Sequence, residues 1–275
     1  MATVTRTQLR RRSSGALGNM LIATATANGT TTTLIDTITL KISDNGLVGR
    51  EAYFYSGTAL NIGLKRTIST SNNAAGSITF PAVTSTVAGD VVEIHNTRAS
   101  GWVVQEIHDE IDSVLREASD SMPKYTRSNV VAVFNKAAPT VTIPATFRGI
   151  YALHWLDADG LYHEIPAASE PSQEGWWVNR GQSELIVNGS YRNTIDTYVV
   201  RIYGTEEYAA LSTDASTTTC NEEWLVNQVC ANLLMRGSER VSDNSRMTKA
   251  DWFQKKADQR RDLLVQVPPP NFVLV

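Results

Sequence analysis

Residues 88–118, AGDVVEIHNTRASGWVVQEIHDEIDSVLREA, change from the spacing of a β-strand to that of an α-helix with no linker between them. They close a longer region, Ala23 to Ala118, that contains the threonine run Thr30 to Thr33. At the end of this region apolar residues recur at helical spacing while charged residues face elsewhere. The apolar set is Val104, Ile107, Ile111, Val114 or Leu115, and Ala118. We therefore expect a β module followed directly by an amphipathic helix over Trp102 to Ala118, which Pro123 ends.

Composition places the chain among folded proteins. It has 275 residues, of which 42% are hydrophobic and 19% are charged. This length predicts one large or two modest domains, and this balance forces neither disorder nor a fibre. The formal net charge of -3 gives no overall attraction to nucleic acid or to an acidic membrane.

Targeting signals and cysteine pairs are also missing from the sequence. The basic start is followed by Ser13-Ser14-Gly15 rather than by the apolar core of a signal peptide. No apolar run approaches the roughly 18 residues that span a bilayer. The two cysteines, Cys220 and Cys230, form no CxxC pair and predict neither a metal set nor a disulfide framework. We expect synthesis and function in an aqueous, cytoplasm-like setting.

Short β-branched runs alternate with turn residues between Leu21 and Arg98. The turns include Asn28-Gly29 and Asp44-Asn45-Gly46, and they recur at the short intervals typical of small antiparallel barrels and sandwiches. Residues 21–98 are therefore expected to form a small β domain. Its expected strands are 34–42, 51–56, 64–70, 77–80 and 90–96.

A second β region is expected over residues 123–205. Asp157-Ala158-Asp159-Gly160 has the composition of half a calcium loop but lacks the distal Glu, so a hairpin turn is favoured there. About seven strands at this spacing indicate a larger sandwich. The expected strands are 130–134, 140–143, 150–156, 161–165, 176–178, 184–186 and 197–203.

Helices return in residues 206–264. Thr219-Cys220-Asn221-Glu222 is a capping-box pattern that predicts a helix to about Met235. Thr248-Lys249-Ala250-Asp251 is a weaker version that predicts a helix to about Leu264. The fold class is thus α+β, in which two antiparallel β domains, a small barrel or sandwich and a larger sandwich, combine with a small helical bundle and extended termini. Its remaining segments are an arm or short helix at 1–20, a packing helix at 99–122 and a Pro-rich tail at 265–275.

Motifs of catalysis are missing from the sequence. It contains no G-x-S-x-G, no P-loop, no G-x-G-x-x-G and no recognisable Cys-His signature. His108 lies in a stretch that lacks the second histidine of a zinc helix, so we interpret it as part of a solvated helix face. We expect no catalytic, cofactor-binding or metal-binding residues, and a protein that is not an enzyme.

The two ends of the chain carry the candidate interaction residues. The first 35 residues hold no acidic residue, so their basic cluster predicts a solvated arm or an arm that docks on a subunit or partner. The arm residues are Arg6, Leu9, Arg10, Arg11 and Arg12. At the other end, three prolines favour an extended backbone, and the apolar tip after them is expected to be buried on a partner or on its own fold. The tail residues are Pro268, Pro269, Pro270, Phe272, Val273, Leu274 and Val275.

Tryptophans in the second β region leave two interpretations open. Trp155, Trp176 and Trp177 could form a platform that stacks on sugars, or they could pack in a core or subunit contact. Because side chains alternate along a strand, at least one of Trp176 and Trp177 is expected to point inward.

With these residues in view, the chain resembles the head-to-tail adaptor proteins, also called neck or connector proteins, of tailed bacteriophages. The motifs that carry the resemblance follow one another in the same order over most of the chain. They are TRTQLRRR (5–12), TAT (24–26), TTTTLID (30–36), LVG (47–49), RTI (66–68), ITFPA (78–82), AGDVVEI (88–94), IHDEIDSVLREA (107–118), RIY (201–203), ALSTD (210–214) and a helix over 224–235.

The resemblance implies a homo-oligomeric ring, usually a dodecamer, that joins the portal protein to a tail tube or nozzle protein. DNA would pass through the lumen without sequence specificity. It further implies a virion location at the head-tail junction after synthesis in the host cytoplasm, no membrane partner, no cofactor, and a C-terminal segment that reaches the portal. The helix 102–118 is expected to pack with 224–235 and 248–264. The family's last helix is here interrupted by Gly237-Ser238 and by Ser242 to Ser245. The alternative is a carbohydrate-binding fibre, collar or decoration subunit of a virion.

Overall fold

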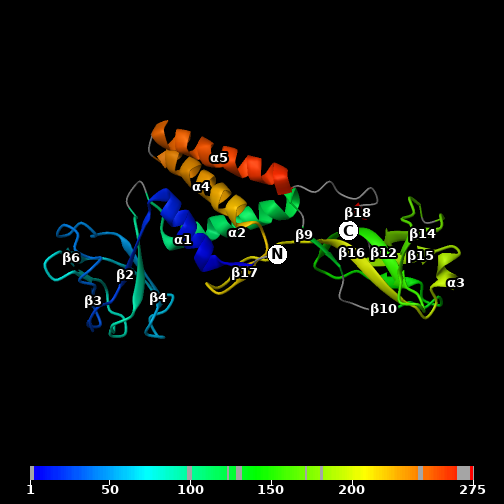
Figure 1. Ribbon diagram of the computed structural model, residues 1–275, viewed down its shortest axis with the longest axis horizontal. Coiled ribbons are helices and arrows are strands. Elements are labelled where there is room, and N and C mark those ends of the chain that lie inside the picture. Colours follow the sequence, from blue (N-terminus) through cyan, green and yellow to red (C-terminus); the bar gives the residue numbers. More distant parts are fainter. Residues whose placement is uncertain are drawn as a thin grey trace. The chain divides into compact units, whose positions relative to one another are not determined.

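The protein combines helices with antiparallel sheets. The computed structural model describes residues 3–97, 101–122, 124–127, 132–170, 172–179, 182–240, 244–264 and 273–274. Within these ranges there are five helices, and none of the sheets closes into a barrel. The chain divides into two compact units, which are drawn in Figure 1. Unit 1 comprises Met1–Val114 and Leu211–Asp262, and unit 2 comprises Leu115–Ala210 and Leu263–Val275.

Two sheets in unit 1 share one apolar core. The four-stranded sheet has the order β2 (Met20–Thr24), β8 (Val91–His95), β4 (Glu51–Ser56), β5 (Lys65–Thr67). The three-stranded sheet has the order β3 (Thr33–Ile35), β7 (Ser77–Thr79), β6 (Thr70–Asn72). Phe54 and Val92 from the first sheet and Leu34 and Ile78 from the second belong to the same buried cluster. The expected β region at 21–98 is therefore present as two packed sheets rather than as a barrel.

The strand expected over 34–42 ends at Ile35 because the carboxylate of Asp36 engages the backbone. Its Oδ1 accepts hydrogen bonds from the N–H groups of Ile38 and Thr39, each at 2.9 Å, and its Oδ2 accepts one from Thr24 at 2.9 Å. Such bonds to following N–H groups form a turn in place of a sheet ladder. Burial alone would raise the pKa of Asp36, but these backbone bonds lower it overall.

Four long helices accompany the sheets. Helix α1 (Arg6–Leu17) opens with a capping box between Thr5 and Gln8 and ends at Gly18, whose φ of 68° is the left-handed cap that glycine favours. Strand β1 (Val4–Thr5) precedes it and pairs with β17 (Thr217–Thr218). The other three are α2 (Val104–Ser121), α4 (Glu222–Arg240) and α5 (Asn244–Leu264).

Helix α2 confirms the helical spacing read from the sequence. All six residues of its expected apolar stripe are fully buried. It ends at Ser121, and Pro123 lies outside the described residues. Glu110 on α2 accepts a hydrogen bond from Asn232 at 2.8 Å and pairs with Arg236 at 2.6 Å, both on α4. The side-chain amides of Gln228 on α4 and Gln254 on α5 bond to each other. The expected packing of α2 with α4 is confirmed, and α4 in turn contacts α5.

Both expected capping boxes are wrong in position. The cap of α4 is Asn221, whose Oδ1 accepts from the N–H of Trp224 at 3.0 Å, because Thr217–Thr218 are already held in β17. Helix α5 begins at Asn244, four residues before Thr248. The expected interruption at Gly237 is also wrong, since α4 continues to Arg240. A Cβ at Gly237 would lie 3.1 Å from Cζ2 of Trp102, so glycine lets the indole approach the helix closely.

Unit 2 contains a six-stranded and a three-stranded sheet. The larger has the order β10-β16-β12-β13, with β9 added beside β16 and β18 added beside β12. The smaller has the order β11-β15-β14. Their bounds are β9 Lys124–Arg127, β10 Ala132–Val133, β11 Thr140–Thr142, β12 Phe147–Leu156, β13 Tyr162–Ile165, β14 Gly175–Asn179, β15 Glu184–Asn188, β16 Val199–Glu206 and β18 Val273–Leu274. The short helix α3 (Tyr191–Thr194) follows β15.

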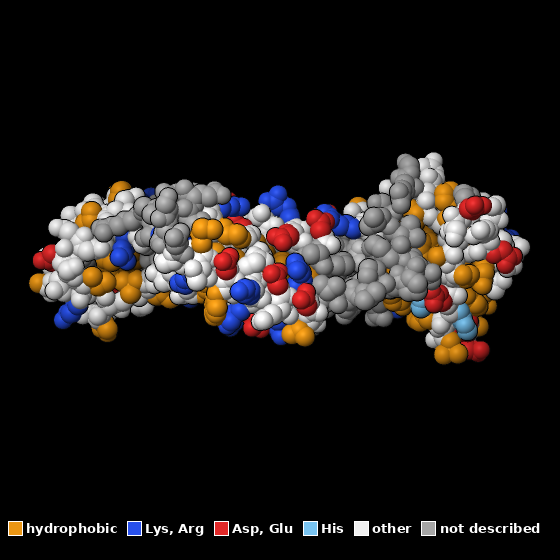
Figure 2. Space-filling view, turned by 90° about the horizontal axis from the view of Figure 1, so that it is seen from above, with side chains coloured by type: hydrophobic (Ala, Val, Ile, Leu, Met, Phe, Trp, Pro, Cys, Tyr) orange, Lys and Arg blue, Asp and Glu red, His pale blue; other side chains and the backbone are white. Residues whose placement is uncertain are grey.

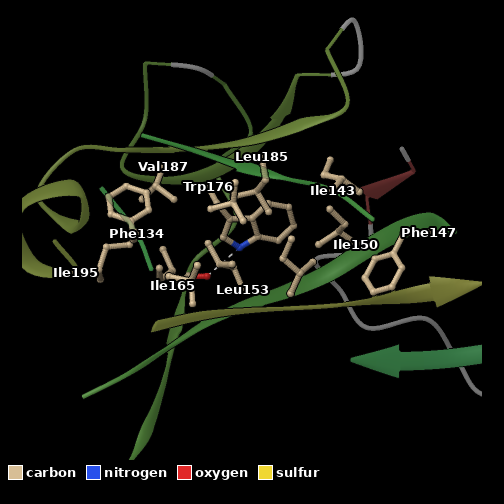
Figure 3. Close-up of a cluster of buried hydrophobic side chains, with 13 residues drawn as sticks. Phe134, Ile143, Phe147, Ile150, Leu153, Ile165, Trp176, Leu185, Val187 and Ile195 are labelled. Carbon is tan, nitrogen blue, oxygen red and sulfur yellow. Dashed lines mark hydrogen bonds between the residues drawn. The ribbon is translucent and has the colours of Figure 1, made fainter. Parts of the chain in front are cut away.

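The two sheets of unit 2 meet over one apolar core, shown in Figure 3. Trp176 of β14 lies at its centre with 1% of its surface exposed, and its indole N–H donates to the carbonyl of Ile165 at 2.9 Å. Leu153 of β12 and Leu185 of β15 bring apolar side chains from the two sheets. The prediction that one of the adjacent tryptophans points inward is confirmed. The expected hairpin at 157–160 is confirmed too, since β12 pairs with β13 across it.

Candidate functional site

The basic residues of the N-terminal segment lie on helix α1 and largely turn into unit 1. Leu9 and Arg10 are buried, and the side chains of Arg6 and Arg11 are 14% and 29% exposed. Only Arg12 among the five expected arm residues keeps most of its side chain, 65%, in solvent, where it pairs with Glu222 at 3.0 Å. A solvated arm is therefore wrong for Leu9 and Arg10, because α1 packs into the core of unit 1.

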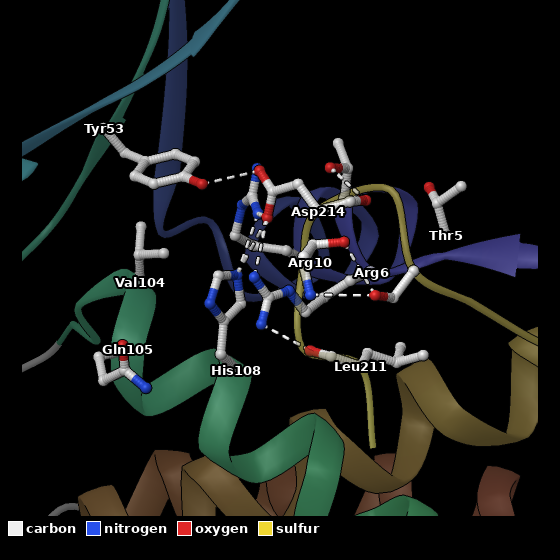
Figure 4. Close-up of polar contacts among 12 residues, drawn as sticks. Thr5, Arg6, Arg10, Tyr53, Val104, Gln105, His108, Leu211 and Asp214 are labelled. Carbon is white, nitrogen blue, oxygen red and sulfur yellow. Dashed lines mark hydrogen bonds and ion pairs between the residues drawn. The ribbon is translucent and has the colours of Figure 1, made fainter. Parts of the chain in front are cut away.

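Arg10 is the centre of a buried polar network, shown in Figure 4. Its Nε and Nη2 donate to the two carboxylate oxygens of Glu93 at 2.7 and 3.1 Å, which makes a bidentate pair. Its Nη1 donates to Oδ1 of Asp214 at 2.7 Å and lies 3.0 Å from Nε2 of His108. The guanidinium carbon also lies 4.6 Å from the ring centroid of Tyr53. We call these five residues the Arg10 junction.

Neighbouring side chains complete the junction. Arg11 donates to Oε1 of Glu93 at 2.6 Å, and its guanidinium carbon lies 3.9 Å from the ring centroid of Tyr55. Arg6 donates to the carbonyl of Leu211 at 2.6 Å. The hydroxyl of Tyr53 donates to Oδ2 of Asp214 at 2.7 Å. Each carboxylate of the junction is thus engaged by more than one donor.

The junction fixes the protonation states of its members. Burial alone would raise the pKa of Glu93, but hydrogen bonds from His95, Arg10 and Arg11 bring it down to about 2. Burial, with repulsion from Arg6 and Arg10, lowers the pKa of His108 to about 3. At neutral pH Glu93 is therefore ionised and His108 is neutral, so Nε2 of His108 accepts from Arg10.

Its chemistry is that of a structural clamp. Neither Glu93 nor His108 has a pKa near 7, where a general acid or base is most effective. Burial and the bond to Asp214 also raise the pKa of Tyr53 well above its usual value. The guanidinium of Arg10 instead ties α1 to β4, β8, α2 and the segment that contains Asp214, which are far apart in the sequence. The arrangement can hold these elements in one geometry.

Sequence reasoning missed the junction. The interpretation of His108 as a solvated residue is wrong, because it is 4% exposed and faces Arg10. One feature of the sequence could have indicated the junction: Glu93 is a charged residue within the otherwise apolar run Val91-Val92-Glu93-Ile94. An ionised side chain in a buried strand requires a cationic partner. That signal does not say which of the arginines supplies it.

The C-terminal tip pairs with unit 2. Val273 and Leu274 form β18, antiparallel to β12, with Leu274 opposite Gly149 and Val273 opposite Ile150. The remaining tail residues proposed from the sequence, Pro268, Pro269, Pro270, Phe272 and Val275, lie outside the described residues. Of the two locations that the sequence left open for the apolar tip, the structure has it on the protein's own sheet.

The outward face of helix α5 is a second candidate contact surface. Ala250, Phe253 and Ala257 are its buried side, whereas Trp252 is 51% exposed. The amine of Lys256 lies 4.1 Å from the ring centroid of Trp252. Figure 2 shows basic and acidic side chains interspersed with apolar ones over this helical region. The apolar part of this surface is thus surrounded by charge.

Other kinds of site have less support. Cys220 and Cys230 are both buried, and burial raises the pKa of Cys230 to about 12. Across the part of the chain that the structure describes, no three or more His, Cys, Asp or Glu residues lie together as a metal site would require. Among the described helices none is both long and apolar enough to cross a bilayer.

Comparison with known proteins identifies no relative: no protein-family model matches the chain, and no curated protein matches it.

Proposed function

We propose that the chain is a non-enzymatic structural subunit that assembles into a ring at the head-tail junction of a phage virion. The observation that carries the proposal is Trp252 on the outward face of α5. The large indole remains half exposed while the opposite face of the same helix is buried. Aromatic residues of this kind, surrounded by charge, are enriched at protein interfaces. A neighbouring copy would bury Trp252 and leave the lysines at the rim.

The Arg10 junction supports the same proposal. A ring subunit has to keep a fixed angle between its elements, since small errors accumulate around the ring. A buried, fully paired guanidinium accepts few alternative arrangements of its partners. The junction would therefore give each copy the same shape.

The remaining features of the proposal follow the resemblance to adaptor proteins. In this arrangement each subunit contains two antiparallel β sandwiches and a helical bundle, and the ring, a dodecamer, binds the portal protein on one side. A tail tube or nozzle protein binds on the other, and DNA passes through the lumen without sequence-specific contacts. A lumen through which DNA passes should not bind phosphates tightly through exposed cationic side chains. Arg10 is buried, which agrees with this requirement.

Assembly is the direct test. We expect native mass measurement and electron microscopy of the purified chain, alone and with portal, to show rings with a central hole. A chain that remains monomeric and does not bind the portal protein would overturn the proposal. The portal contact expected of residues 268–275 is tested separately, by retention of a chain truncated after Val267 on portal particles.

A pair of variants tests the surface. Trp252→Glu is expected to abolish the ring while the circular dichroism spectrum stays unchanged. Ile38→Glu is the matched control, because Ile38 is 79% exposed but lies in a loop of the first β region. Rings that survive Trp252→Glu would exclude α5 as the subunit contact.

The carbohydrate-binding alternative has less support. It requires an exposed aromatic platform, and Trp176 is instead part of the core of unit 2. Glycan binding that disappears with Trp177→Ala would favour this alternative, whereas an adaptor is expected to give no sugar signal.

A further inference from the structure

Strand β12 has one edge that is covered by two different partners. Its pairing with β16 covers the other edge from Phe147 to Leu156. On the first edge β13 pairs only with Leu153 to Leu156. Among the described residues, Gly149 and Ile150 are paired on that edge only by β18. The first half of this edge is therefore an acceptor that an extended segment has to fill.

The acceptor combines a strand edge, which offers backbone hydrogen bonds, with the apolar core of unit 2 beside it. Ile150 is fully buried in the core of unit 2, and the pairing of β12 with β16 is irregular on both sides of residues 149–150. Such irregularities bend a strand and are common where pairing begins or ends. An open edge of this kind binds extended apolar segments through backbone hydrogen bonds.

The segment that fills the acceptor follows a helix of the other unit in the sequence. Helix α5 belongs to unit 1 up to Asp262, whereas β18 belongs to unit 2. Eight residues, 265–272, separate them, and three of these are proline. Fully extended, eight residues span at most roughly 26–29 Å. The short strand β18 follows a helix and not another strand of its sheet, so it is not part of a hairpin.

The backbone pairing of β18 is short. Its pairing with β12 covers two residues, and a backbone hydrogen bond contributes only about 1 kcal/mol net. A second copy of the chain offers the identical strand with identical contacts, so exchange between copies has a small net free-energy change. In a ring, the tail of one copy would be present near β12 of the next copy at about millimolar effective concentration.

We propose that the acceptor edge of β12 is a strand-exchange site, at which Val273–Leu274 of a neighbouring copy takes the position of the chain's own β18 when the ring assembles. This inference rests on the proposed function, because it needs copies placed side by side. It assigns a partner to the tail that differs from the portal: the β12 edge of the next subunit.

The acceptor is tested first, without assembly. A chain truncated after Val267 is titrated with a fluorescent peptide of residues 268–275, PPPNFVLV, under conditions where the chain is monomeric. Saturable 1:1 binding is expected, with at least tenfold weaker binding to the full-length chain. The matched control peptide PPPNFPPV should not bind, since proline lacks the N–H that pairing requires. Equal binding of both peptides, or of neither, would overturn the acceptor.

Exchange is tested with cysteines at facing positions. Directly opposed residues of antiparallel strands have Cα atoms about 4.5–5.5 Å apart, within the range of a disulfide. A Gly149→Cys chain and a Leu274→Cys chain with different tags are co-assembled and then oxidised. Exchange predicts a covalent heterodimer on a non-reducing gel. Neither chain alone should give it, because Cys220 and Cys230 are buried.

The outcomes separate the inference from the proposed function. Rings that form while the double variant Gly149→Cys/Leu274→Cys links only within one chain would overturn exchange and leave the ring intact. A tail cysteine that links to portal instead of to Gly149→Cys would also overturn exchange. A chain that stays monomeric at all concentrations with portal present would overturn the proposed function, and interchain exchange with it.

Discussion

Helix α1 of unit 1 is held by a buried charge, whereas the two sheets of unit 2 meet over buried apolar side chains. Arg10 has directional partners, Glu93, His108 and Asp214, each of which must be present and correctly ionised. Trp176 has one hydrogen bond and otherwise belongs to a cluster of aliphatic and aromatic side chains. The sheets of unit 1 also share an apolar core, so the difference teaches that one chain can hold a helix by charge and a pair of sheets by shape. The two units should therefore unfold under different conditions.

The largest expected effect comes from removing the central charge. Arg10→Ala leaves Glu93 buried with fewer partners, and breaking a buried pair from one side costs about 3–5 kcal/mol in the free energy of unfolding. Arg12→Ala, on the same helix, removes an exposed pair and should cost at most about 1 kcal/mol. Urea unfolding followed by helical circular dichroism measures both. A loss below about 1 kcal/mol for Arg10→Ala would contradict the assignment of the junction.

The second largest expected effect is the selective unfolding of unit 1 at low pH. The folded pKa of Glu93, about 2, lies below its usual 4.5, so its contribution is present above pH 4.5 and is lost as the pH falls toward 2. The folded pKa of His108, about 3, lies below 6.5, so proton uptake by the unfolded chain also lowers stability as the pH falls from 6.5. The shift at Glu93 alone corresponds to a contribution on the order of 3 kcal/mol.

Hydrogen exchange read by mass spectrometry checks the acid effect in each unit separately. Peptides from α1 and β8 should lose protection at higher pH than peptides from β14 and β15. His108→Gln, which keeps an acceptor for Arg10, should flatten the dependence between pH 6.5 and 3 without removing the Glu93 part. Simultaneous loss of protection in both units would contradict the comparison.

The third effect concerns the apolar core. Trp176→Phe removes the indole hydrogen bond to Ile165 and leaves a small void, which together cost about 2 kcal/mol. Trp252→Phe is the matched control, because that ring is half exposed, and it should change stability by less than about 0.5 kcal/mol. The measurement is the unfolding midpoint, by hydrogen exchange, of the unit that contains each tryptophan: unit 2 for Trp176 and unit 1 for Trp252. No change is expected in the acid sensitivity of unit 1.

The smallest effect distinguishes the observed cap of α4 from the expected one. Asn221→Ala removes the side-chain bond to the N–H of Trp224 and should cost about 1 kcal/mol. Thr219→Ala should cost less than half of that. Urea unfolding of the two variants decides, and a larger loss for Thr219→Ala would restore the capping box expected from the sequence.

Local patterns predicted the elements that depend on periodicity. The stripe of α2 and most strands, including β4 and β7, lie within a few residues of their expected positions, since burial on one face imposes a repeat on the sequence. Competition for the backbone was harder to foresee: Asp36 shortens β3, and Asn221 rather than Thr219 caps α4. Both outcomes depend on which of several polar side chains reaches a free N–H group.

The Arg10 junction could not be predicted from local patterns. Arg10 is 83 residues from Glu93, 98 from His108 and 204 from Asp214. A basic run at the start of a chain has the same appearance whether it remains in solvent or enters a core. Only the fold brings the opposite charges together. Of the two expectations for the arm, solvated or docked on a subunit or partner, the solvated one is wrong at Leu9 and Arg10, which are buried.

The sequence separation between Arg10 and Asp214 also sets the order in which the parts of the Arg10 junction become available during synthesis on the ribosome. Chains emerge from the amino end, so Arg10 and Glu93 are both made long before Asp214 leaves the exit tunnel. All of residues 115–210 of unit 2 are synthesised in this interval. A nascent chain of 210 residues would hold α1 with one of its two carboxylate partners missing. Unit 1 therefore begins before unit 2 but is completed only after residues 115–210 have been made.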